Sequence, residues 1–230
     1  MIGFAGDTHM AAVMRAAAHI KGLPTTAKDF DKCDLVFIAQ DVNSEADLPA
    51  LNKLIDIIFE QCPNPIPIVL ASQVPIGFTR PLCQRHHDLY YQVDTIIMNQ
   101  ALERAISPEQ IIVGVADVTL PISFTYNRYL EAFGSVSVVL MDIEAAELTK
   151  HAINYYLAAQ LAATNVLSSL VTEEQWAQII PALRNDKRIG QYAYLRPGKI
   201  GGHLPRDVRR IRKLLDCDPL TGAIVAQCQQ

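Results

Sequence analysis

Residues 143–170 read IEAAELTKHAINYYLAAQLAATNVLSSL, and the pattern from Met141 to about Val171 is typical of one long helix with very few breakers. The stretch is rich in alanine and more apolar than a helix on the surface of a domain should be. Such a helix must be covered on nearly all sides, either by its own domain or by a second subunit. We therefore expect a homodimer that forms through the helix around residues 142–170.

Upstream of this helix, short apolar runs alternate with helical patterns. Apolar runs of this kind between helices are typical of parallel strands that are buried on both faces. The sequence therefore predicts an α/β fold with a Rossmann-like, doubly wound parallel sheet. The expected strands cover residues 2–5, 19–23, 34–39, 66–71, 95–98 and 110–114, and the expected helices cover 9–19 and 48–61 and begin within 77–87.

Downstream, two shorter helices are expected at about 173–184 and 205–215, with a glycine-containing loop between them. We place the domain boundary near residues 133–138. The expected organisation is a Rossmann-like NAD(P)-binding domain at residues 1–135. An all-α central domain, built on the long dimerisation helix, then follows at residues 136–230.

The composition excludes several classes of protein. The chain is 50% hydrophobic and 19% charged, which is enough apolar material for a core. Its net charge of −4 supplies no cationic field for nucleic acid. No apolar run suits a membrane span, and a strand-like run opens the chain instead of a secretion signal. The five dispersed cysteines form neither a disulfide framework nor a CxxC pair, so we expect a cytoplasmic protein without a metal site.

Five blocks of sequence occur in an order that carries a family resemblance. In the long helix, Ala146, Glu147, Lys150, Asn154 and Asn165 match the pattern A-E-x-x-K-x-x-x-N with a later asparagine. The other blocks are SQVPIG at 72–77, SPEQIIVG at 107–114, RIG at 188–190 and RPGKIGGHLPRD at 196–207. Together they resemble the nucleotide-sugar (UDP-glucose/GDP-mannose) dehydrogenases from residue 2 to about residue 215. The resemblance implies an NAD-dependent oxidoreductase with a small-molecule, nucleotide-sugar substrate.

A nucleotide-binding turn is expected after the first strand. Rossmann strands are usually followed by G-x-G-x-x-G, whose glycines permit a tight turn and let a pyrophosphate approach the helix N-terminus. Here Gly6, Thr8 and Ala11 fill the glycine positions, with His9 and Met10 before the last of them. Alanine is an accepted variant, whereas threonine narrows the phosphate passage. We expect the turn either to bind NAD, with NADP left open, or to be a structural relic.

The resemblance adds further positions around the cofactor. It places Gln40, Gln73 and Arg206 there, with Arg206 matching a family lysine near the phosphates and Gln73 replacing a threonine of the water network. The acidic residue that binds the adenosine ribose, about 20 residues after the turn, has no clear counterpart. Asp29 and Asp31 lie nearer to the next element.

Lys150 and Asn154 are the first candidate catalytic pair. Their i to i+4 spacing puts both side chains on one helix face, one turn apart. The resemblance makes this face line the active site, where the two residues stabilise the oxyanion-like oxygens that develop at the sugar C6. The alternative is a lysine that is simply solvated at a helix surface. The apolar character of the helix favours the functional interpretation.

The family's nucleophile is missing. The family oxidises an alcohol twice through a cysteine thiohemiacetal and thioester, but residues 201–207 read GGHLPRD and contain no cysteine. His203 takes the cysteine or the serine position, depending on the register, and Cys217 lies too far along to substitute. Since imidazole forms no stable thioester, we expect a single hydride transfer. His203 would act as a general base, with an ordinary pKa of about 6.5, or would cap the helix that starts at Pro205.

Other acid–base groups of the family are kept or altered. Asp207 would orient water or Lys150, although a carboxylate in the first turn of a helix is favoured by the dipole anyway. Two family glutamates become Gln100 and Arg104, and Glu103 takes over only if the loop shifts slightly. The resemblance thus predicts a site whose acid–base equipment differs from that of the family.

The family continues into a third domain that holds the nucleotide part of the sugar, so we expect this chain to be a truncated, divergent member that lacks it. Two hypotheses follow. The chain is an NAD(P)-dependent oxidoreductase that transfers one hydride between an alcohol and an aldehyde on a sugar-like substrate. Alternatively, it is a degenerate homologue that binds a nucleotide or a partner protein without catalysis.

Overall fold

The computed structural model describes residues 1–62, 65–96, 98–215 and 218–228. The chain forms two compact units, Met1–Lys150 and His151–Gln230. This division lies later than the expected boundary at 135/136. The strand at Ser137–Asp142 (β7) belongs to the sheet of the first unit, and the first turns of the long helix at Ile143–Ser168 (α5) also belong to that unit.

The first unit contains a seven-stranded sheet with the order β2-β1-β3-β4-β5-β6-β7. Strands β2, β1, β3, β4 and β5 are parallel, β6 is antiparallel to β5, and β7 is parallel to β6. This mostly parallel sheet confirms the predicted α/β, Rossmann-like fold. The strands are β1 (Ile2–Ala5), β2 (Thr25–Thr26), β3 (Leu35–Ile38), β4 (Ile68–Leu70), β5 (Leu89–Gln92), β6 (Gln110–Val115) and β7.

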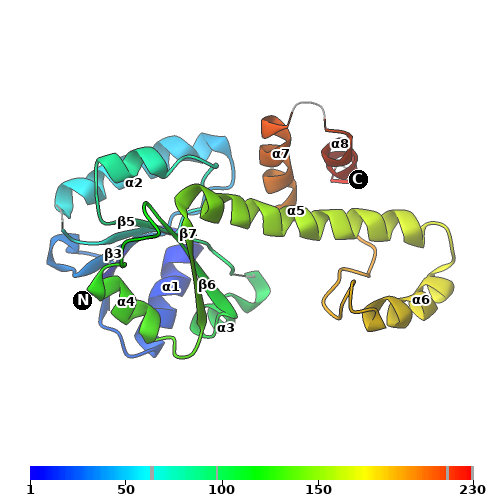
Figure 1. Cartoon of the computed structure of the whole chain (residues 1–230), viewed down its shortest axis with the longest axis horizontal. Coiled ribbons are helices and arrows are strands. Elements are labelled where there is room, and N and C mark those ends of the chain that lie inside the picture. Colours follow the sequence, from blue (N-terminus) through cyan, green and yellow to red (C-terminus); the bar gives the residue numbers. More distant parts are fainter. Residues whose placement is uncertain (63–64, 97, 216–217, 229–230) are drawn as a thin grey trace. The chain divides into compact units, whose positions relative to one another are not determined.

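Helices cover both faces of this sheet. Figure 1 shows α2 (Leu48–Gln61) on one face and α1 (His9–Ile20), α3 (Ala101–Ile106) and α4 (Phe124–Glu131) on the other. The apolar faces of these helices form two cores: Met14 and Tyr126 pack with Phe37 on one side, and Leu51 packs with Ile38 on the other. The predicted helices at 9–19 and 48–61 are thus confirmed, whereas α3 and α4 were not predicted.

Two strand predictions were wrong, and one strand was missed. Residues 19–23 end α1 and turn at Gly22, whose φ of 80° starts the approach to β2. The strand expected at 95–98 lies earlier, as β5. The Asp94 side chain accepts a hydrogen bond from the Ile96 amide, and this turn ends the extended stretch. Residue 97 is outside the described residues. Strand β7 lies at the sheet edge and is largely exposed, so it lacks the apolar run that identifies buried strands.

The first two turns of α5 cross the sheet at Gly114 of β6. A Cβ at this position would lie 2.8 Å from the Ala146 Cβ and 3.0 Å from the Ile143 Cα. Glycine therefore lets the helix backbone lie directly against the strand. Because β7 runs against β1, β3, β4 and β5, a helix that starts at the end of β7 travels toward the carboxyl ends of those strands.

Glu147 ties α5 to the loop after β4. Its two carboxylate oxygens accept hydrogen bonds from the Gly77 amide at 2.5 Å and the Thr79 amide at 2.8 Å. The side chain is fully buried, and burial raises its pKa despite these bonds. One turn earlier, Glu144 accepts two hydrogen bonds from Arg80 at the surface. The loop that the SQVPIG block begins is thereby held against the long helix.

The second unit is all helical among its described residues. It contains the rest of α5 with α6 (Glu173–Asn185), α7 (Leu204–Leu214) and α8 (Pro219–Gln227). Its core joins Ala158 and Leu161 of α5 to Val208 and Ile224 of the last two helices. The predicted helices at 173–184 and 205–215 are confirmed, and α8 was not predicted. Among the described residues of the whole chain, no helix has the length and hydropathy needed to cross a bilayer.

We predict that Glu147→Gln lowers the free energy of unfolding by about 1–3 kcal/mol. The amide that replaces one carboxylate oxygen turns a donor toward a backbone N–H and leaves that buried group without an acceptor. The matched control is Glu144→Gln, whose half-exposed ion pair with Arg80 contributes only about 0–1 kcal/mol. Urea unfolding followed by circular dichroism measures both. Equal losses for the two variants would contradict the role assigned to Glu147.

Candidate functional site

A glycine and three polar side chains follow four neighbouring parallel strands at the points where the strands end. Gly6 follows β1, Gln40 follows β3, Gln73 follows β4 and Asp94 follows β5. The carboxyl ends of parallel strands meet at one edge of a sheet, which is where open α/β sheets bind ligands. This edge therefore collects the positions expected to surround a cofactor in the first unit.

The Gly6 turn connects β1 to α1. Gly6 has a φ of 138°, and a Cβ there would lie 2.7 Å from the Ala39 oxygen. Both facts require glycine. The Asp7 amide donates to Gln40 Oε1 at 3.3 Å, and the Gln40 amide donates to Ser72 Oγ at 2.9 Å. The turn after β1 is thereby joined to the ends of β3 and β4.

The three side chains that follow the turn point in different directions. Thr8 Oγ1 donates to the Ala39 oxygen at 3.3 Å and accepts from the Asp41 amide at 3.0 Å, so this side chain is held against the end of β3. His9 is exposed, and Met10 is buried in the core. Because its side chain is in the core, Met10 can contact a ligand only through its backbone amide. The helix start at Thr8 has no side-chain cap.

A cavity of about 130 Å3 opens beside this turn. Phe4 lines it from β1, Gly6 and Thr8 from the turn, Ala11 and Arg15 from α1, and Ala27 from the position after β2. Its walls therefore come from the first strand, the first helix and the end of the second strand. This is the part of a Rossmann fold that contacts a dinucleotide.

Lys150 lies at the carboxyl edge, next to the end of β5. Its Nζ donates to the Asp94 carbonyl oxygen at 2.6 Å and lies 3.7 Å from Asp94 Oδ2. Gln73 Nε2 donates to the same Oδ2 at 2.6 Å. All three residues are buried. The cation predicted from the helix pattern thus shares the edge with the Gly6 turn, with β3 and β4 between them, and its charge is neutralised by Asp94.

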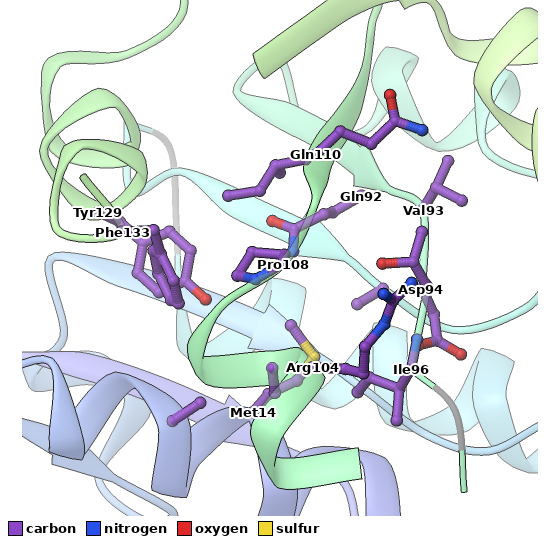
Figure 2. Close-up of a pocket in the computed structure, with 15 residues that line it drawn as sticks. Met14, Gln92, Val93, Asp94, Ile96, Arg104, Pro108, Gln110, Tyr129 and Phe133 are labelled. Atoms are coloured by element: carbon purple, nitrogen blue, oxygen red, sulfur yellow. The ribbon is translucent and has the colours of Figure 1, made fainter. Parts of the chain in front are cut away.

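A second cavity, of about 50 Å3, lies on the α1 and α4 side of the sheet. Figure 2 shows the rings of Tyr129 and Phe133 on one side of it and Asp94 on the other. Arg104, which stands where the family has a glutamate, also lines it and donates to Glu109 Oε1 at 2.5 Å. Near Asp94, this chain therefore places a cation where the resemblance implies a carboxylate.

In the second unit, a buried cluster surrounds Asp207. Asn154 Nδ2 donates to Asp207 Oδ2, and Arg206 donates to both carboxylate oxygens at 2.8 and 3.0 Å. His151 Nδ1 lies 3.3 Å and Arg210 lies 3.8 Å from Oδ1. Asp207 itself is completely buried. Asn154, Arg206 and Asp207, three of the predicted site residues, are thus brought together.

Burial alone would raise the pKa of Asp207, but hydrogen bonds from His151 and Arg206 hold the pKa well below its ordinary value. His203 begins α7 and lies partly exposed beside this cluster, with its Nδ1 3.3 Å from an Arg206 nitrogen. His203 occupies the N-cap position of α7, as the capping alternative expects, but its side chain makes no capping hydrogen bond to the helix.

Three residues of these clusters were not predicted: Asp94, His151 and Arg210. His151 follows Lys150 directly, but an isolated histidine on an apolar helix carries no sequence signal. Asp94 directly precedes the strand that was wrongly expected at 95–98. Arg210 belongs to a basic run that is ordinarily a solvated helix face, and only the fold reveals that it is buried.

Comparisons with known proteins agree with this architecture. Residues 144–229 match the model of the UDP-glucose/GDP-mannose dehydrogenase family, central domain. The chain is 24% identical over 220 residues to a UDP-glucose 6-dehydrogenase of Rickettsia conorii, a match that covers 88% of this chain and 50% of that protein. The chain thus spans about half the length of this curated relative.

Two solved structures share the fold. A UDP-D-ManNAc dehydrogenase of Pyrococcus horikoshii has a TM-score of 0.78 at 15% identity, over 99% of this chain and 67% of that one. A UDP-glucose dehydrogenase of Pyrobaculum islandicum has a TM-score of 0.77 at 16% identity, over the same shares. Residues 144–229 thus match the central domain of that family, and the chain shares the fold of nucleotide-sugar dehydrogenases.

We predict that Asp207→Asn lowers the free energy of unfolding by about 3–5 kcal/mol, because Arg206 and Arg210 lose their buried counterion. The pKa of Asp207 is below its unfolded value of about 3.9, so its contribution is complete above that pH and declines as the pH falls. The difference between the wild-type chain and the variant should therefore shrink in acid. Urea unfolding at neutral pH and at about pH 3, followed by Trp176 fluorescence, measures it.

Asp186→Asn is the matched control in the same unit. Asp186 forms an ion pair with Arg188, whose side chain is 89% exposed, so the substitution should cost about 0–1 kcal/mol. A loss for Asp207→Asn that stays constant with pH would show that the ionised carboxylate is not the stabilising group.

Proposed function

We propose that this relative of the nucleotide-sugar dehydrogenases is an NAD(P)-dependent oxidoreductase that transfers one hydride between an alcohol and an aldehyde on a sugar-like substrate. The observation that supports it most is the burial of Lys150 beside Asp94 at the sheet edge that also carries the Gly6 turn. A buried ion pair often stabilises a fold no more than apolar residues of similar volume would, so its presence favours a role beyond stability. A nucleotide-sugar substrate follows from the family alone.

The residues of the Gly6 turn suit a dinucleotide. The absent side chain at Gly6 leaves the backbone close to Ala39, and Thr8 is drawn toward β3 rather than across the cavity. The uncapped amides at the start of α1 are positioned as in sites that hold a pyrophosphate. When bound, the nicotinamide ring would supply the hydride acceptor or donor. Gln40 and Gln73 would hold the neighbouring strand ends in place through their hydrogen bonds.

Lys150 would polarise the reacting oxygen of the substrate. A cation aimed at developing negative charge stabilises it most strongly where water is excluded. Asp94 would position the ammonium group through its carbonyl and its carboxylate, and Gln73 would hold that carboxylate in turn. The hydroxyl proton would pass to an ordered water. In the second unit, Asp207 would hold Asn154 and Arg206 in fixed orientations.

A single oxidation step is proposed because no thiol replaces the family's cysteine. The segment 201–207 contains none. Burial raises the pKa of Cys62 and of Cys83 to about 11, so both thiols stay protonated and weakly nucleophilic at neutral pH. Cys217 lies outside the described residues. Without a thiol in the segment 201–207, the family's covalent route to an acid is closed, and the reaction ends at the aldehyde.

The second candidate is a nucleotide-binding or partner-binding protein without catalysis. One observation favours it: Arg104 lines the cavity near Asp94, at a position where the family has a glutamate. This change reduces the acid–base groups near the sheet edge. The nucleotide-binding form of this candidate differs from the first candidate in turnover alone.

We predict that Lys150→Met lowers turnover by about 10²–10³-fold and leaves the affinity for the reduced dinucleotide unchanged. Binding is followed by the fluorescence of NADH or NADPH, and turnover by nicotinamide absorbance with UDP-glucose and simple polyols. The variant leaves the Asp94 carboxylate without its counterion. The double variant Lys150→Met/Asp94→Asn is therefore measured beside it, to separate an effect on catalysis from an effect on folding. Lys53→Met, at an exposed position of α2, is the control. Dinucleotide binding without any turnover in the wild-type chain would establish the second candidate instead.

A homodimer through α5 is also proposed. In the second unit, Tyr156, Val166 and Leu167 are exposed on α5, and Leu170 is exposed just beyond its end, with exposed fractions from 51% to 75%. Their spacing follows the helical repeat, so they form one apolar stripe. An exposed apolar stripe of this kind is typical of a subunit interface.

We predict that Leu167→Glu/Leu170→Glu raises the dimer dissociation constant by about tenfold or more, because charges are forced into the interface. Leu214→Glu, at a similarly exposed leucine of α7, should leave association unchanged. Sedimentation velocity over a dilution series measures both. A wild-type chain that sediments as a monomer at every concentration would rule the dimer out.

A further inference from the structure

The cavity beside the Gly6 turn extends toward the end of β2, where a Rossmann fold binds the adenosine ribose. One wall is α1, with Ala11, Ala12 and Arg15, and the opposite wall includes Ala27. Ala27 directly follows the last residue of β2. The groups around Ala27 therefore decide which ribose, with or without a 2′-phosphate, fits this end of the cavity.

No carboxylate stands at the end of β2. A carboxylate there accepts hydrogen bonds from the two ribose hydroxyls and selects NAD. The residues at this point are Thr26, Ala27 and Lys28, and the Thr26 hydroxyl is engaged locally: it accepts from the Lys28 amide at 3.1 Å and donates to the Lys28 oxygen at 3.0 Å. The next carboxylate, Asp29, lies 4.0 Å from Lys32, and its φ of 51° places it at the start of a new turn.

Cations take the place of that carboxylate. Arg15 lines the cavity from the second turn of α1, and among the described residues no carboxylate forms an ion pair with its guanidinium. Lys28 is exposed next to Ala27. A guanidinium beside the ribose accommodates a 2′-phosphate, whose oxygens it binds through a planar fork of donors.

Asp7 is the carboxylate on the cavity wall, and it belongs to the Gly6 turn rather than to β2. It therefore lies at the pyrophosphate end, which NAD and NADP share. Its charge weakens the attraction for both dinucleotides alike and leaves the preference between them to Arg15, Ala27 and Lys28.

We infer that this chain prefers the 2′-phosphorylated dinucleotide, NADP(H), and that Arg15 and Ala27 determine the preference. The inference rests on the dinucleotide binding proposed above and adds the cofactor's identity to it. A phosphate carries about −1.5 to −2 charges at neutral pH, so an unpaired guanidinium on the wall attracts it. Ala27 leaves room for the phosphate where a carboxylate would repel it.

The full chain is titrated with NADPH and with NADH, each followed by its own fluorescence. We expect NADPH to bind about tenfold more tightly or better. Arg15→Gln should weaken NADPH binding about tenfold and leave NADH binding unchanged. Ala27→Asp should reverse the preference, because it restores the carboxylate that binds a ribose diol. Lys53→Gln, an exposed cation on α2 away from the cavity, should change neither affinity.

The outcomes separate this inference from the proposed function. Tighter binding of NADH than of NADPH by the wild-type chain overturns the inference and leaves the oxidoreductase proposal in place. An equal loss of both affinities in Arg15→Gln overturns the role of Arg15 as the discriminating residue. Failure of both dinucleotides to bind a chain that circular dichroism shows to be folded overturns the proposed function and the inference with it.

Discussion

The close contact of α5 with β6 at Gly114 is the constraint on which the candidate site of the first unit depends. Any side chain at Gly114 would collide with Ala146 and Ile143, so the helix can lie on the sheet only over a glycine. Since α5 starts where β7 ends, it runs toward the carboxyl ends of the parallel strands. Its second turn then brings Glu147 to the loop after β4 and Lys150 to the end of β5.

Each unit places charge in a buried position and compensates it with its own residues. In the first unit, one cation meets one carboxylate, and the carbonyl of the same residue takes a further hydrogen bond. In the second unit, Asp207 meets two arginines, a histidine and an amide. Removing one member would leave a buried charge without a partner, which costs several kcal/mol. The Asp207 cluster is therefore a structural requirement of α7 whether or not it takes part in chemistry.

The departures from the family pattern share one direction. The acidic groups that the resemblance implies near the cofactor and the substrate are absent or replaced, by Ala27 and Lys28 after β2 and by Gln100 and Arg104 before α3 and within it. Asp94 supplies a carboxylate from the end of β5 instead. The chain thus has the fold and the long helix, while its electrostatics differ from the family pattern.

Several elements could be predicted from residue patterns because their burial is local. The apolar runs of β1 and β3 and the periodic faces of α1, α2, α6 and α7 each carry their own signal. Strand β7 carries none, because an edge strand that is largely exposed owes its position to pairing with β6. Strand β5 was placed too late because the turn that ends it depends on a hydrogen bond from Ile96 to Asp94.

By itself, the sequence determined the α/β class, the long helix and the spacing of Lys150 and Asn154, since the helical repeat places residues four apart on one face. It also determined that the segment 201–207 offers no thiol. Only the tertiary structure decided that Asp94 neutralises Lys150 and that His151 and Arg210 are buried against Asp207. Lys150 and Asp94 are 56 residues apart, as are His151 and Asp207, and Arg210 lies on a helix face that looks solvated in the sequence. Packing between elements, rather than any local pattern, brings these charges together.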